Sequence, residues 1–152
     1  MSTTRAPITR DPTRALAADS TVEALARPLP ALGRALMAAI FLVSGVGKLA
    51  APAATIAYIQ KAGLPMPEVA FAVAAAVEVV GGVLLLVGYR TRTVALVLAL
   101  FTVAAALSFH TAFGDRNQWI HFLKNLAMAG GLLQVAAFGA DAFSVDAQRG
   151  RV

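Results

Sequence analysis

Residues 66–88 read MPEVAFAVAAAVEVVGGVLLLVG, an apolar stretch long enough to cross a bilayer as a helix at about 1.5 Å per residue. One carboxylate, Glu78, lies in the middle of this stretch. A charge at the centre of a bilayer costs about 2.5–3.5 kcal/mol, so it needs a partner, a water-filled cavity or a bound proton. Glu78 is therefore a candidate functional residue of a membrane-spanning chain.

The composition of the chain is that of a membrane protein. Of its 152 residues, 59% are hydrophobic and 14% are charged, whereas soluble domains carry about 25% charged residues. The net charge of +5 comes largely from arginines beside the apolar stretches, where positive charge sets membrane orientation, so we expect no nucleic-acid partner. Because the chain has no cysteine, thiol redox chemistry, iron–sulfur ligation and thiolate zinc sites are excluded, and no metal site is expected.

The predicted fold class is all-α, a transmembrane four-helix bundle. The four spans are expected at residues 29–50, 67–88, 92–111 and 119–139. Together they form one membrane domain, residues 29–139. Residues 1–28 mix Arg, Thr and acidic side chains with few large apolar ones, which predicts a flexible cytoplasmic N-terminal tail. Residues 140–152 are expected to form a cytoplasmic C-terminal tail.

The orientation follows from the distribution of positive charge between the two sides of the membrane. One side receives Arg5, Arg10, Arg14, Arg27, Arg90, Arg92, Arg149 and Arg151. The other side receives Lys61 and Arg116. Because the more positive side faces the cytoplasm, both termini are predicted to be cytoplasmic.

The connections between spans also carry signals. Gly63 and Pro65 are expected to fix a loop before the second span. In the short connection GYRTRT, residues 88–93, Gly88 is predicted to end one helix and Thr91 or Thr93 to cap the next. A connection this short makes the second and third spans antiparallel neighbours.

Four polar residues are expected in the outer half of the membrane. Lys48 lies near the outer end of the first span and His110 near the outer end of the third. Lys124 and Asn125 lie one to two turns inside the outer end of the fourth. Because a lysine side chain can reach inward as well as toward the interface, Glu78 is expected to pair with Lys124 or Lys48.

The first span carries two further polar residues. Ser44 lies one helical turn before Lys48 and shares its face. Arg34 lies near the cytoplasmic end, and we interpret it as an anchor whose side chain extends to the interface.

Small residues accompany the polar ones. Ala74 and Gly82 lie four residues on either side of Glu78, and Gly131 lies on the Lys124 face of the fourth span. Such residues let helices approach closely, which predicts that these faces point into the bundle. A charged pair there can also do no more than fix the register of two helices.

The chain carries, in this order, Arg34, FLVSGVGKL (41–49), AGLP (62–65), EVVGGVLLLVGYRTR (78–92), His110, KNLAMAGGLL (124–133) and SVDA (144–147). This order of segments resembles the DoxX family of small four-helix membrane proteins. The resemblance carries over Arg34, Ser44, Lys48, Glu78, Gly82, His110, Lys124 and Asn125. It implies a multi-pass protein of the bacterial inner membrane and an association with quinone-linked oxidation systems.

The sequence is compatible with three functions. The leading hypothesis is an accessory or quinone-associated subunit of a membrane oxidoreductase or oxidative-stress system, with no catalytic activity alone. Glu78, Lys124 and His110 would line its pocket, quinone is the candidate cofactor, and no catalytic residue is predicted. The second is a small transporter that uses Glu78 as a proton or cation relay. The third is a structural partner without activity; beyond the lipid bilayer, an oxidoreductase subunit or a second copy of the chain is the expected partner.

Overall fold

The computed structural model describes residue 24 and residues 26–150, and these are helical apart from short connections. Most of the predicted N-terminal tail, and residues 151–152, lie outside the described residues. The helices are α2 (Leu29–Ala50), α3 (Pro52–Lys61), α4 (Pro67–Val87), α5 (Thr91–Phe109), α6 (Arg116–Phe138) and α7 (Val145–Gln148). The four ranges expected for the spans correspond to α2, α4, α5 and α6.

Three of these helices, among the residues that the structure describes, are long and apolar enough to cross a membrane. They are α2 with 22 residues, α4 with 21 and α5 with 19. The fourth long helix, α6, has 23 residues but is less apolar, because it carries polar side chains such as Lys124 and Asn125. The all-helical fold is therefore established together with three membrane-spanning candidates.

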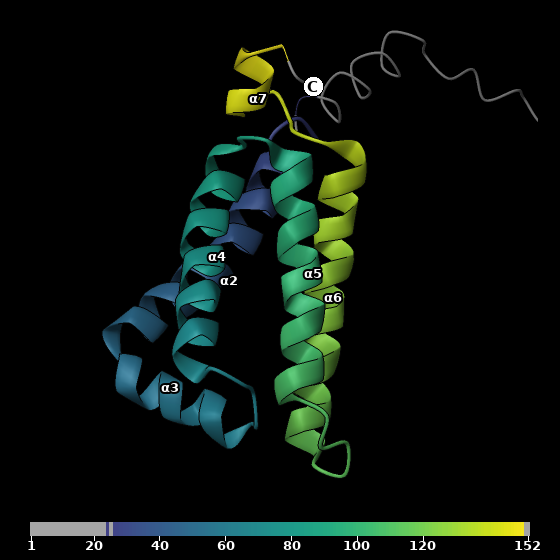
Figure 1. The fold of residues 1–152 in the computed structure, drawn as a ribbon. Helices are drawn as coiled ribbons and strands as arrows, with labels where there is room; N and C mark the ends of the chain where they lie inside the picture. Colours follow the sequence, from purple (N-terminus) through teal and green to yellow (C-terminus); the bar gives the residue numbers. More distant parts are fainter. Residues whose placement is uncertain (1–23, 25, 151–152) are drawn as a thin grey trace, which may run out of the picture.

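The four long helices lie side by side (Figure 1). The closest pairs are α2 with α4 and α5 with α6, while α4 and α5 are joined by the short turn at Gly88. The start of α2, the end of α6 and α7 lie at one end of the bundle, and α3 lies near the other (Figure 1). This arrangement leaves α2 and α6 with little contact between them.

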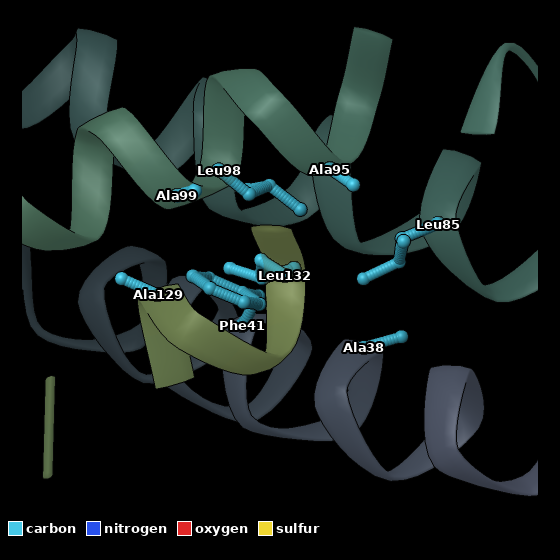
Figure 2. Packing of buried hydrophobic residues seen from close by; sticks show 8 residues of the cluster. All are labelled: Ala38, Phe41, Leu85, Ala95, Leu98, Ala99, Ala129 and Leu132. Carbon is cyan, nitrogen blue, oxygen red and sulfur yellow. The ribbon is translucent and has the colours of Figure 1, made fainter. Parts of the chain in front are cut away.

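Small side chains make up much of the buried core. Every long helix contributes to it: Ala38, Phe41, Leu85, Ala95, Leu98, Ala99, Ala129 and Leu132 (Figure 2). Gly82 on α4 faces α2, since a Cβ added there would lie 2.9 Å from Leu42 Cδ2 and 3.4 Å from the Ala38 carbonyl oxygen. The absence of a side chain at Gly82 thus allows the close approach of α2 and α4 that positions the polar site.

Two short helices lie in segments for which no helix was predicted. The first, α3, begins with Pro52 at a position where the missing amide hydrogen costs nothing, and it buries Ile59. The expected loop before α4 is confined to residues 62–66. The second, α7, is a single turn capped by Ser144, whose hydroxyl accepts a hydrogen bond from the Ala147 amide.

The start of α5 differs from its prediction. The cap expected from Thr91 or Thr93 is wrong, because Thr91 is the first helical residue and no side chain within the turn caps the helix. Gly88 does end α4, in the left-handed conformation at φ +69° that favours glycine.

Candidate functional site

Glu78 forms a buried ion pair with Lys48. Only 6% of Glu78 is exposed, and Lys48 Nζ lies 2.7 Å from its Oε2 and 2.9 Å from its Oε1. Lys48 also donates to Ser44 Oγ at 2.7 Å, and Ser44 Oγ donates to Glu78 Oε1 at 3.3 Å. Charged hydrogen bonds of this kind are stronger than neutral ones and offset part of the cost of burying the Glu78 carboxylate and partly burying the Lys48 ammonium.

Helix geometry explains how these three residues meet. Ser44 and Lys48 are four residues apart on α2, so they share one face. Gly45 lies on the neighbouring part of that face, where an added Cβ would lie 2.7 Å from Val79 Cγ2. Because Gly45 lacks a side chain, α4 comes close enough for the Glu78 carboxylate to reach the end of Lys48.

The ion pair lines a cavity of about 430 Å³, which is within the usual range for a small-molecule site. Polar side chains meet apolar and aromatic ones in its wall. The lining residues are Ser44, Lys48, Thr55, Tyr58, Ile59, Leu64, Ala70, Val73, Ala74, Glu78, Phe101, Ala104, Ala105, Ser108, Phe109, His110 and Asn125. Tyr58 of α3 stacks on Phe109 of α5, with ring centroids 5.4 Å apart, so α3 forms part of the wall.

His110 is held at the end of α5 by two contacts. Its Nδ1 lies 2.8 Å from Gln118 Oε1, and its ring stacks on His121 with centroids 5.2 Å apart. Since an amide oxygen can only accept, the Nδ1 atom is the donor for this amide orientation. Asn125 donates its side-chain amide to the His121 carbonyl oxygen at 2.9 Å. The cavity therefore has a polar wall on α5 and α6, apart from the ion pair.

Lys124 does not belong to this site. Its side chain is exposed on α6, and it is absent from the residues that line the cavity. The expectation that Lys124 lines the pocket is therefore wrong, and of the two partners considered for Glu78 the structure brings Lys48 to it. The reason is its position around the helix axis: Lys124 has a suitable depth along α6, but it lies on an exposed face and not on the face that lines the cavity.

Arg34 does not belong to it either, and its interpretation as an interfacial anchor is wrong. Only 3% of Arg34 is exposed. Its guanidinium forms an ion pair with Asp141 and donates to the Phe143 carbonyl oxygen at 3.0 Å. Arg34 thus fastens the segment after α6 to the start of α2.

Asp146 lies in the same C-terminal segment as Asp141. It was not among the candidate functional residues predicted from the sequence. Its carboxylate accepts hydrogen bonds from the amides of Arg90 and Thr91, at 2.9 and 2.7 Å, and from Thr91 Oγ1 at 2.8 Å. It therefore supplies from α7 the cap that α5 lacks in its own turn. The segment SVDA, residues 144–147, indicates a helix N-terminus here, because Ser and Asp are typical of helix N-termini.

The remaining small residues fall in different places. Ala74 lines the cavity one turn before Glu78. Gly131 faces α2, where an added Cβ would lie 2.9 Å from Met37 Sδ. In the part of the chain that the structure describes, no group of three or more His, Cys, Asp or Glu side chains could hold a metal ion.

Comparison with known proteins identifies the family. The family model for DoxX matches residues 29–111, which include α2, α4, α5 and the ion pair. Inner membrane protein YqjF of Escherichia coli is 36% identical over 118 residues, covering 76% of this chain and 87% of YqjF. Inner membrane protein YphA of the same organism is 32% identical over 127 residues, covering 80% of this chain and 91% of YphA. No solved structure gives a significant match.

These findings agree with the apolar helices and with the resemblance drawn from the sequence. The expected location in the bacterial inner membrane is confirmed by the two relatives and by the three spanning candidates. The chain belongs to the DoxX family and is an integral protein of the inner membrane.

Proposed function

We propose that the cavity beside Glu78 binds a quinone and that the protein serves as an accessory subunit of a membrane oxidoreductase or oxidative-stress system. The observation that carries this proposal is the Lys48–Glu78 ion pair in the wall of a cavity of about 430 Å³. A lipid-soluble ligand with a polar head needs an apolar slot with a few polar groups at one place, and this wall supplies both.

The chemistry of the lining fits a quinone head group. Its carbonyl oxygens are acceptors, and Lys48 and Asn125 carry donors in the wall. Its flat ring matches the stacked rings of Tyr58 and Phe109. Oxidation of the reduced quinone releases two protons and two electrons: Glu78 can accept one proton, the second would leave to solvent, and both electrons would pass to the partner subunit proposed below.

We assign the electron transfer itself to a partner subunit. The chain has no cysteine, and its described residues include no cluster of metal-ligating side chains. In this arrangement the protein would hold or deliver quinone beside a redox-active subunit.

We further propose a four-span topology with both termini in the cytoplasm. Arg27, Arg90, Arg92 and Arg149 belong to the end of the bundle where α7 lies, while Lys61 and Arg116 belong to the other end. By the positive-inside rule the α7 end faces the cytoplasm, and α6 crosses the membrane as the fourth span. A C-terminal green fluorescent protein fusion would then fluoresce, and a C-terminal alkaline phosphatase fusion would be inactive; the reverse pattern contradicts this topology.

A second candidate function is a proton or cation relay, favoured by the position of Glu78 near the middle of α4 in the wall of an open cavity. Proteoliposomes separate the two functions. A relay predicts a pH-gradient-driven flux that Glu78→Gln abolishes, whereas the quinone proposal predicts no such flux.

The proposal is tested by the binding of a short-chain ubiquinone to the purified protein. Ala74→Leu adds bulk to the cavity wall, and Ala72→Leu adds the same bulk to an exposed face of the same helix. We expect Ala74→Leu to weaken binding at least tenfold and Ala72→Leu to leave it unchanged. Equal binding by both variants, or no binding by the native protein, contradicts a quinone site in this cavity.

A further inference from the structure

A second cavity, of about 590 Å³, lies between α2 and α6, two long helices with little contact between them. It runs from the middle of the bundle to the end where α7 lies. Its wall is mostly apolar and includes Pro30, Gly33, Met37, Gly131, Gly139 and Asp141. We call this cavity the α2–α6 groove.

The groove is open because glycines line it. An added Cβ at Gly33 would meet nothing within 4 Å, so the space beside this part of α2 is empty of protein atoms. On the α6 side, Gly131 lies against Met37, which forms the inner limit of the groove. The result is an apolar cavity along about two helical turns of α2 and α6, in which part of a hydrocarbon chain can lie.

Positive charge flanks the end of the groove that lies nearest α7. Exposed Arg27 precedes the lining residue Pro30 on α2. Arg92 lies beside the lining residue Gly139, where an added Cβ would be 2.8 Å from Arg92 Nε. The carboxylate in the lining, that of Asp141, is neutralised by its ion pair with Arg34. Arg27 and Arg92 thus place two arginine side chains near the mouth of the groove, in addition to the Arg34–Asp141 pair in its wall.

From this combination we infer that the α2–α6 groove binds one anionic phospholipid, with an acyl chain between the helices and the phosphate beside Arg27 and Arg92. The apolar wall suits part of an acyl chain, and the arginines at the mouth complement the phosphate. Basic pockets between helices at the positive side of a membrane are suited to anionic head groups for this reason. This site is separate from the cavity beside Glu78 and does not depend on the proposed quinone.

The test is native mass spectrometry of the full chain in neutral detergent, titrated with phosphatidylglycerol or with phosphatidylcholine. We expect one phosphatidylglycerol to bind more tightly than phosphatidylcholine. Arg92→Gln should weaken phosphatidylglycerol binding about five-fold, the effect of one arginine near a membrane surface, and leave phosphatidylcholine unchanged. Arg116→Gln, at the other end of the bundle, is the matched control and should have no effect.

A second pair of variants tests the groove itself. Gly33→Leu fills the groove, whereas Gly47→Leu adds the same side chain to an open position on the same helix outside it. We expect Gly33→Leu to abolish the bound lipid and Gly47→Leu to retain it, with both proteins folded by circular dichroism. Retention of lipid by Gly33→Leu overturns the proposal. A dimer that dissociates in Gly33→Leu with no change in bound lipid also overturns it, because a second copy would then occupy the groove.

Discussion

Lys48 Nζ lies 2.7 Å from one oxygen of the Glu78 carboxylate and 2.9 Å from the other, so a single ammonium group is shared by both oxygens. The pair joins the end of α2 to the middle of α4 and is 24% exposed at the lysine side chain and 8% at the glutamate. It is therefore both a link between helices and a charged part of the cavity wall.

Replacing one member of the Lys48–Glu78 pair should lower the free energy of unfolding more than replacing both. Lys48→Met leaves the Glu78 carboxylate buried without its counter-charge, which we expect to lower the free energy of unfolding by about 3 kcal/mol. The double variant Lys48→Met/Glu78→Gln leaves no unpaired charge and should recover most of that loss. Denaturant unfolding in mixed micelles measures the cycle, with Lys61→Met, at an exposed position, as the control. Additive losses would show that the two residues do not interact.

The cap that Asp146 supplies to α5 should contribute more to the free energy of unfolding than an exposed helix cap does. Asp146→Ala removes three hydrogen bonds at the start of α5, and we expect it to cost about 2 kcal/mol of unfolding free energy. Asp115 caps α6 in the same way but is exposed, so Asp115→Ala should cost less than about 1 kcal/mol. Thermal unfolding of both variants compares them, and an equal loss would contradict a special role for Asp146.

Gly88 should tolerate substitution less well than another glycine with a similar backbone. Gly88 has φ +69° and an added Cβ would lie 2.5 Å from Ser144 Cβ, whereas Gly63 has φ +78° with nothing within 4 Å. Gly63→Ala should therefore cost about 1 kcal/mol from backbone strain alone. Gly88→Ala should cost more, because it also displaces the segment that carries Asp146. Limited proteolysis should show the C-terminal segment released in Gly88→Ala and retained in Gly63→Ala.

The phenol of Tyr89, in the turn between α4 and α5, has a pKa that is shifted by its neighbours. Hydrogen bonding and positive charge from Arg90, with a further contribution from Arg149, lower the pKa of the Tyr89 phenol below its ordinary value of about 10. A lowered pKa favours the phenolate, so the stabilisation is present above the ordinary value and is lost as the pH falls through the lowered one.

Arg90→Gln should raise the pKa of Tyr89 toward its ordinary value. The chain has two tyrosines, so the titration is measured by ultraviolet absorbance in a Tyr58→Phe background that leaves Tyr89 alone. An unchanged titration would mean that Arg90 does not act on the phenol.

Much of the fold could be predicted because hydropathy and helix breakers act locally. The ranges of the long helices follow from apolar length, glycines and prolines. By contrast, α3 is short and only partly apolar, and its helix depends on packing Ile59 and Tyr58 against the bundle. A segment of ten residues is too short to show the hydrophobic periodicity that predicts such a helix.

The candidate site could be predicted only in part, for a geometric reason. Depth along a span can be counted from the sequence, and it placed both Lys48 and Lys124 within reach of Glu78. Rotation about the helix axis decides between them, and it depends on how the helices pack. The pairing of Arg34 with Asp141 joins residues 107 positions apart, so no local spacing could indicate it.

Whether the Lys48–Glu78 pair helps to bind quinone is measured by the affinity of a short-chain ubiquinone for the native protein and for Lys48→Met/Glu78→Gln. This double variant removes the charged wall of the cavity but leaves no unpaired charge, so the fold should persist. We expect at least a tenfold loss of affinity, as befits the loss of one charged hydrogen bond, with unchanged helix content. Equal affinity in the folded double variant would contradict a role of the pair in quinone binding and leave it as a link between α2 and α4.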